Sequence, residues 1–171
     1  MSTTRSAFVS VVFFLATLLL VSCGDMYDTI DVSSNGDVHF TTRVVVKENI
    51  SAKELDEIFR QISTDLNARG WRVSHSLGKG APVEVVVRGK GNIRTVAPSY
   101  VVGAGPVYKI VKLSNTDYDV FLNSIGGPYK RFVKFESSLL SSAAKVTDAD
   151  GKVVNNLEIA GSAKTVRIVL K

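Results

Sequence analysis

The residue best placed to do chemistry in this 171-residue chain is Cys23, its only cysteine. It follows Leu20-Val21-Ser22 at the end of a nearly uninterrupted apolar run that begins at Ala7, and Arg5 is the only charged residue before that run. The run is shorter than the roughly 20 apolar residues that cross a bilayer, and it ends in small residues, which is typical of a cleavable export segment over residues 1–22. Without a second thiol, Cys23 forms no intrachain disulfide, so modification of its sulfur is the expected chemistry.

The sequence Leu20-Val21-Ser22-Cys23 resembles the lipobox of bacterial lipoprotein signals. The resemblance implies a thioether-linked diacylglycerol on Cys23, cleavage after residue 22, and acylation of the new N-terminus by chains such as palmitate. It also implies a lipid-anchored, extracytoplasmic location on a bacterial membrane, facing the periplasm or the outer surface. Whether the inner or the outer membrane carries the anchor stays open.

Side chains that bind metals or act as nucleophiles are few and do not converge in the sequence. His39 and His75 are the only two histidines. Each falls in a strand-like pattern without the further ligands that a zinc site needs. The run Asp148-Ala149-Asp150-Gly151 lacks the later oxygen ligands of a calcium loop, and a β-turn fits it better. We therefore expect no catalytic site, no metal, no cofactor and no enzymatic activity.

Aromatic and basic side chains interleave from Tyr129 to Phe135. Rings and cations together suit an interface at which acyl chains meet phosphates or sugars. The candidate residues for a membrane-facing or ligand-binding surface are Tyr129, Lys130, Arg131 and Lys134. Aromatic core residues beside a solvated basic edge explain the same pattern, so both interpretations stay open.

Positive charge is concentrated in the C-terminal part of the chain. Residues 23–80 contain 7 Lys and Arg against 9 Asp and Glu, whereas residues 81–171 contain 13 against 7. A basic half close to a membrane can face anionic lipid or glycolipid, and an ordinary solvated surface is the alternative. Nucleic acid is not an expected partner, because the chain has an export segment and no recognisable nucleic-acid-binding motif.

The clearest β signal is a hairpin that follows the cysteine. Alternating apolar residues predict strands over 27–34 and 37–47. Asn35-Gly36 lies between them and predicts a type I′ turn, which needs positive φ angles. This hairpin is expected to contribute one face to the core.

An amphipathic helix is predicted over residues 52–69. Ser51 and Glu54 form a capping box at its start, and Gly70 stands where a left-handed C-terminal cap falls. A strand over 71–77 follows. The helix residues expected in the core recur at helical spacing: Leu55, Ile58, Phe59, Ile62 and Leu66.

The rest of the chain is predicted to be mainly β, with a turn at 89–92 and an open strand order within residues 83–113. A second, short helix is predicted after Ser114 or Asn115, because four apolar residues follow at helical spacing: Tyr118, Phe121, Leu122 and Ile125. The further strands are expected over 83–88, 93–96, 99–102, 107–113, 129–136, 139–146, 152–154 and 165–170.

These elements indicate one α+β domain over residues 23–171. Its sheet is expected to be mainly antiparallel and twisted or partly closed, with the long amphipathic helix packed on one face and one short helix beside it. The 149 residues after the export segment are enough for a single hydrophobic core.

The order of lipidated cysteine, hairpin, amphipathic helix, short helix and β-rich C-terminal section resembles, weakly, the LppM-type envelope lipoproteins. The resemblance covers most of residues 20–171, but individual binding residues do not align. The expected function is a non-enzymatic, lipid-anchored envelope protein that binds a lipid, glycolipid or other envelope ligand at the membrane surface. The alternative is a structural or assembly subunit of an envelope complex, which would pair an exposed edge strand with a partner protein.

Overall fold

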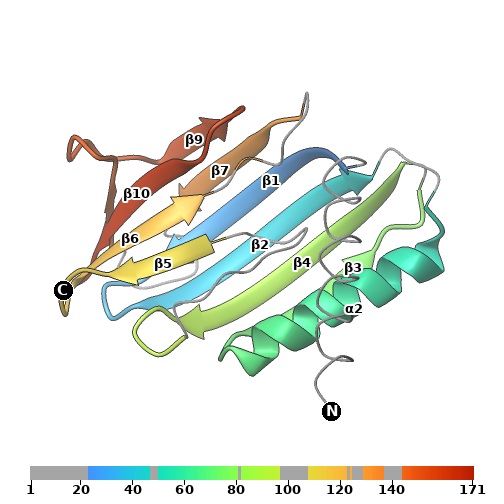
Figure 1. Ribbon diagram of the computed structural model, residues 1–171, viewed down its shortest axis with the longest axis horizontal. Helices are drawn as coiled ribbons and strands as arrows, with labels where there is room; N and C mark the ends of the chain where they lie inside the picture. The colour runs from blue at the N-terminus through green and yellow to red at the C-terminus, as the bar shows by residue number, and fades with distance from the viewer. Residues whose placement is uncertain are drawn as a thin grey trace, which may run out of the picture.

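The computed structural model describes residues 23–46, 50–80, 82–96, 108–122, 124, 129–136 and 144–171. Within these ranges the chain has one helix and ten strands (Figure 1). In chain order they are β1 (Cys23–Val32), β2 (Asp37–Val46), α2 (Ala52–Ala68), β3 (Arg72–Leu77), β4 (Val83–Asn92), β5 (Tyr108–Lys112), β6 (Asp117–Leu122), β7 (Arg131–Glu136), β8 (Lys145–Thr147), β9 (Asn156–Ile159) and β10 (Lys164–Val169).

The strands form two sheets. The larger has six strands in the order β3-β4-β2-β1-β7-β9, and the smaller has four in the order β5-β6-β10-β8. All neighbouring strands are antiparallel except β1 and β7, which are parallel. The prediction of a mainly antiparallel α+β fold is therefore confirmed, whereas the prediction of a single sheet is wrong.

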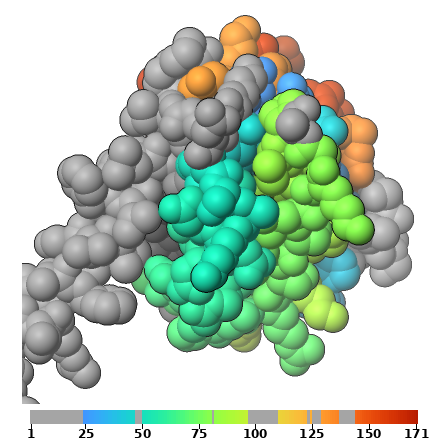
Figure 2. Space-filling model, turned by 90° about the vertical axis from the view of Figure 1, so that its right-hand side faces the viewer, coloured from blue at the N-terminus to red at the C-terminus, as the bar shows by residue number. Residues whose placement is uncertain are grey.

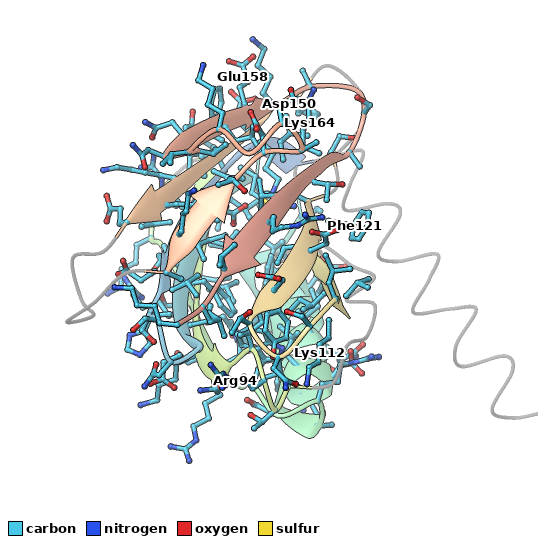
Figure 3. The ribbon with its side chains drawn as sticks, turned by 90° about the vertical axis from the view of Figure 1, so that its left-hand side faces the viewer. Arg94, Lys112, Phe121, Asp150, Glu158 and Lys164 are labelled. Carbon is cyan, nitrogen blue, oxygen red and sulfur yellow. The ribbon has the colours of Figure 1, made fainter. Side chains whose placement is uncertain are left out.

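One face of the six-stranded sheet is covered by α2 and by the four-stranded sheet, and we call it the inner face (Figures 1 and 3). The buried apolar side chains form one cluster, to which both sheets and the helix contribute, for example Val44, Val120 and Phe59. Successive side chains of a strand point to opposite faces. The alternate residues of the six-stranded sheet therefore lie on the opposite side, which we call the outer face.

The β1–β2 hairpin is confirmed, but its turn is not of the predicted type. Gly36 has a φ of 93°, whereas Asn35 has no positive φ. A type I′ turn needs positive φ at both central residues, so that prediction is wrong. The Ser33 N–H donates to the Asp37 carbonyl at 2.8 Å, which leaves three residues in the loop with Gly36 in the left-handed position. The Ser33 hydroxyl also accepts a hydrogen bond from the Asp37 N–H.

The capping box of α2 is confirmed. The Ser51 hydroxyl accepts a hydrogen bond from the Glu54 N–H at 3.2 Å, and the Glu54 carboxylate accepts one from the Ser51 N–H at 3.1 Å. The helix ends at Ala68, and Gly70 follows with a φ of 94°. The local start and stop signals therefore predicted this element to within one residue.

The packing of α2 follows its apolar spacing. Leu55, Phe59 and Leu66 are buried, while Ile58 and Ile62 are half-buried and pack against the same cluster. The helix lies on β3, the strand that immediately follows it, so this contact is local in the chain.

The short helix predicted within residues 114–125 is wrong, because the structure has strand β6 there. Tyr118, Val120 and Leu122 are buried, and the residues between them are only partly so. Buried and partly exposed side chains thus alternate as in a strand, and β6 pairs with β5 on one side and β10 on the other. The Ser114 hydroxyl accepts a hydrogen bond from the Asp117 N–H, as a helix cap would. Here this contact closes a bend before β6, and no helix follows.

β4 continues through Gly89-Lys90-Gly91, where a turn was predicted. A Cβ atom on Gly89 would lie 2.2 Å from Cζ of Phe40, and one on Gly91 would lie 2.8 Å from Cε3 of Trp71. The Phe40 and Trp71 rings meet edge to face with centroids 5.5 Å apart. These glycines leave room for the two rings inside a strand, so their role is close packing.

Replacing Gly89 by Ala is expected to lower the free energy of unfolding by about 1–3 kcal/mol, because the new methyl group overlaps the Phe40 ring. The measurement is urea unfolding of the protein in mild detergent, followed by the fluorescence of Trp71. Gly80→Ala is the matched control, since the nearest atom to its Cβ is the Pro82 carbonyl oxygen at 3.8 Å. Equal midpoints for the two variants would contradict the packing role.

Smaller differences concern the middle and the end of the chain. Residues 93–96 form a turn and not a strand, β9 was not predicted, and Val153 makes only an isolated bridge with Thr147. The turn at Asp148–Gly151 is present, with Gly151 at a φ of 79°. The predictions for residues 1–22, 99–102 and 137–143 lie outside the described residues.

Candidate functional site

The four candidate surface residues separate in the structure. Arg131 points to the inner face and is 1% exposed, so its assignment to a surface is wrong. Tyr129 is half-buried against the core cluster. Lys130 and Lys134 are exposed beside Phe132, which also points outward. Of the predicted set, the two lysines are exposed, Tyr129 is partly exposed, and Arg131 alone is buried.

Both lysines have an acidic partner. The Lys130 ammonium lies 2.7 Å from the Glu158 carboxylate, and this hydrogen bond and charge hold the pKa of Lys130 above its ordinary value. Lys134 forms an ion pair with Glu136. Exposed pairs of this kind contribute little to stability, but they cancel much of the local positive charge. This region is therefore less cationic than its sequence suggests.

Arg131 instead forms a buried ion pair between the two sheets. Its Nε donates to the Asp28 carboxylate at 2.5 Å, and Asp28 also accepts a hydrogen bond from the Thr42 hydroxyl at 2.5 Å. Asp28 is 2% exposed and Thr42 is fully buried. The three residues come from β7, β1 and β2, so their side-chain contacts link three adjacent strands at the centre of the six-stranded sheet. Their enclosure indicates a structural role.

An aromatic pair lies on the outer face near the start of β1. The Tyr27 and Phe132 rings stack with centroids 5.2 Å apart and an interplanar angle of 14°. The Arg43 guanidinium lies 4.7 Å from the Tyr27 ring centroid and forms an ion pair with Glu84 at 3.2 Å. Tyr27 is 37% exposed. Phe132 is half-buried. A partly exposed ring stack with an adjacent cation suits contact with a lipid or sugar surface.

A second group of cations on the outer face was missed as a set. Arg72 on β3 lies opposite Lys90 on β4, and Arg88 lies two residues before Lys90 on the same face. We call these three residues the basic triad. Arg88 and Lys90 belong to the basic C-terminal part of the chain, and Arg72 belongs to the acidic N-terminal part. Only the pairing of β3 with β4 brings them together.

Cys23, the predicted lipidation site, is the first residue of β1 and pairs with Val46 of β2. β1 lies inside the six-stranded sheet, between β2 and β7. We call this end of the sheet the Cys23 end. Glu158 and Lys164 mark it in Figure 3, and Arg94 and Lys112 mark the opposite, distal end. No residues separate the cysteine from the folded sheet.

A cavity of about 120 Å³ lies among Ile30, Val32, Phe135 and Val146, with Glu136 and Lys145 at its border. Ligand pockets typically have roughly 300–1,000 Å³. This cavity is therefore too small to enclose an acyl chain, and it does not support a lipid-burying pocket at this position.

Ser63, His75 and Asp56 have the order of a nucleophilic triad but not its geometry. Asp56 lies 3.0 Å from Nε2 of His75, and the Ser63 hydroxyl lies 3.4 Å from Nδ1. That hydroxyl donates to the Phe59 carbonyl at 2.8 Å, and Ser63 is 8% exposed. An attacking serine must instead be open to a substrate and donate to the histidine. These contacts dock α2 on β3.

No group of three or more His, Cys, Asp or Glu side chains in the described ranges is arranged to hold a metal ion. No helix in the part of the chain that the structure describes has the length and apolar composition to cross a membrane. Comparison with protein-family models, curated proteins and solved structures gives no match to this chain.

Proposed function

We propose that residues 23–171 form one extracytoplasmic domain that is lipid-anchored through Cys23 to a bacterial membrane and acts at the membrane surface. The observation that carries the proposal is the position of the lipobox cysteine at the first residue of β1. Cleavage before Cys23 would remove the export segment and leave the sheet intact. A lipid on this residue would then hold the folded domain against the bilayer without a linker.

The proposed activity is binding of a lipid or glycolipid at that surface, without catalysis. The outer face supports it, because the exposed Tyr27 ring and the half-buried Phe132 ring lie on the same face as the basic triad. Aromatic rings suit the boundary between acyl chains and headgroups, and cations suit phosphates. The cavity beside Val146 is too small to enclose an acyl chain, so it offers no alternative to the outer face at that position.

A role as an assembly subunit of an envelope complex is the second candidate, through strand pairing at a sheet edge. β3 forms one edge of the six-stranded sheet, and Figure 2 shows it beside α2. The Asn67 side chain accepts a hydrogen bond from the Val73 N–H at 2.7 Å, so α2 already occupies part of this edge. This contact favours the membrane-surface function over pairing at β3.

Membership of the LppM-type envelope lipoproteins also remains a proposal. The lipobox and the order of hairpin and helix support it. The short helix that formed part of the likeness is strand β6, which weakens it.

Replacing Cys23 by Ser is expected to abolish incorporation of radioactive palmitate in bacterial cells and to leave the export segment uncleaved. The oxygen of serine does not form the thioether that lipidation requires. The measurement is the label on the immunoprecipitated protein together with its mobility on a gel. Ser22→Ala is the matched control, because alanine satisfies the same lipobox position and should keep the label. Equal labelling of the Cys23 variant and the native protein would overturn the lipid anchor.

A further inference from the structure

We propose that the outer face of the six-stranded sheet lies flat on the anionic surface of the membrane, with Arg72, Arg88 and Lys90 contacting lipid phosphates. This placement rests on the proposed lipid anchor at Cys23. It goes beyond that anchor because it specifies which face of the domain contacts the membrane, which lipid headgroups it contacts and which residues bind them.

The arrangement of the basic triad is unfavourable in the isolated protein. Arg72 and Lys90 are direct cross-strand partners on one face, where like charges are destabilising. All three side chains are exposed, and none makes a hydrogen bond or ion pair with any residue in the described ranges. A phosphate above the sheet would relieve this repulsion by accepting hydrogen bonds from the guanidinium and ammonium groups.

None of the described carboxylates of the outer face forms an ion pair with the basic triad. Glu84, Glu136 and Glu158 pair with Arg43, Lys134 and Lys130, Asp37 accepts a hydrogen bond from Asn92, and Asp31 is 2% exposed. Within the described residues, positive charge without an ion-pair partner therefore gathers where β3 and β4 pair, whereas Asp37 and Asp31 lie on β2 and β1. An anionic partner is the complementary one.

The aromatic stack supports a bilayer as the source of the phosphates. Tyr27 lies only four residues after Cys23, and its partner Phe132 is its direct neighbour on β7. In the proposed orientation both rings would meet the headgroup region next to the anchor, where amphipathic aromatic side chains are favoured. Anchor, rings and cations then contact the same membrane.

Electrostatic screening distinguishes this orientation from one in which the domain stands on its Cys23 end. Val83 lies at that end, and Arg88 is five residues further along β4, which is roughly 17 Å at 3.4 Å per residue. The triad of an upright domain would be well beyond the Debye length of about 8 Å at physiological ionic strength. Each cation at an anionic surface favours contact about fivefold, so three favour the flat orientation on the order of 100-fold.

The test uses the full, lipid-anchored protein reconstituted in phosphatidylcholine vesicles with and without phosphatidylglycerol. Because the proposed thioether consumes the Cys23 sulfur, a fluorophore attaches only to an introduced thiol. Ser74→Cys places it on the outer face opposite Arg88, and Thr64→Cys places it on the exposed face of α2. Quenching by lipids that carry a nitroxide in the headgroup region reports contact with the bilayer.

We expect strong quenching at position 74 with phosphatidylglycerol, little quenching without it, and little at position 64 in either case. Neutralising the basic triad with Arg72→Gln, Arg88→Gln and Lys90→Gln should lower the equilibrium constant for bilayer contact on the order of 100-fold. Raising the ionic strength to 1 M, where the Debye length is about 3 Å, should weaken contact in the native protein. The matched control, Lys112→Gln, Lys145→Gln and Lys152→Gln, removes the same charge outside the outer face and should leave the quenching unchanged.

Absence of quenching at position 74, equal quenching in neutral vesicles, or equal loss in both triple variants would overturn the inference. Failure of the lipid anchor gives a different result, because the protein would then not be retained on neutral vesicles. In that case cosedimentation of the same labelled chain with phosphatidylglycerol vesicles still tests the outer face. Near-native circular dichroism of both triple variants separates loss of contact from loss of folding.

Discussion

Replacing Arg131 by Met should lower the free energy of unfolding by about 3–5 kcal/mol, because it leaves the Asp28 carboxylate charged and buried without its partner. Asp28 is 2% exposed. The hydrogen bond that it accepts from the Thr42 hydroxyl does not cancel its negative charge. A methionine fills much of the volume of the arginine stem, so the loss reports the charge more than a cavity. Urea unfolding followed by Trp71 fluorescence measures it.

Two further variants show whether the buried pair is the cause. Lys134→Met changes an exposed cation on the same strand and should shift the free energy of unfolding by at most about 1 kcal/mol. The double variant Asp28→Leu with Arg131→Met removes both charges and should recover much of the lost stability. If the double variant is as unstable as Arg131→Met alone, packing and not the uncompensated carboxylate explains the loss.

Truncating Phe59 to Ala is expected to lower the free energy of unfolding by about 3–5 kcal/mol, because a fully buried ring is removed and a cavity remains. Phe59 lies at the centre of the buried face of α2, and its ring centroid is 6.2 Å from that of His75 on β3. The change removes contacts between the helix and the sheet. Urea unfolding and amide hydrogen exchange along α2 are the measurements.

The neighbouring Arg60 supplies the control. It is exposed and pairs with Glu57 at 2.6 Å within the same helix. Arg60→Ala keeps the helix propensity and should change stability by at most about 1 kcal/mol. Similar unfolding midpoints for Phe59→Ala and the native protein would show that α2 does not contribute to the cooperative core.

The sequence predicted well those elements that are specified by local signals. The Ser51–Glu54 box started α2 at the right residue, and the alternating apolar residues on either side of Asn35-Gly36 gave the β1–β2 hairpin. Both depend on residues only a few positions apart. The second helix failed because Tyr118 and Leu122 satisfy helical spacing and strand alternation equally, and the pairing of β6 with β5 and β10 decided between them.

The candidate surface was harder to predict because its partners are distant in the chain. Nothing in the local sequence distinguishes Arg131 from an exposed arginine. It is buried because it pairs with Asp28, which lies 103 residues earlier in the chain. Two glycines so close together suggested a turn. The Phe40 and Trp71 rings that need the space above Gly89 and Gly91 come from distant positions in the chain. The basic triad likewise depends on the register between β3 and β4. Strand alternation separates neighbouring residues of one strand, but it does not tell which strands will be neighbours.

Under the proposed export, which starts at the N-terminus, the parallel pairing of β1 with β7 would set an order of folding events. β2 can pair with β1 as soon as residues 23–46 have crossed the membrane, but β7 ends only at Glu136. Contacts of such long sequence separation form slowly. Under the proposed anchor, β1 from Met26 to Asp31 would therefore keep one edge unpaired while most of the domain was still crossing. Cys23 lies outside the register of β7, so acylation of the cysteine would not depend on when β7 arrives.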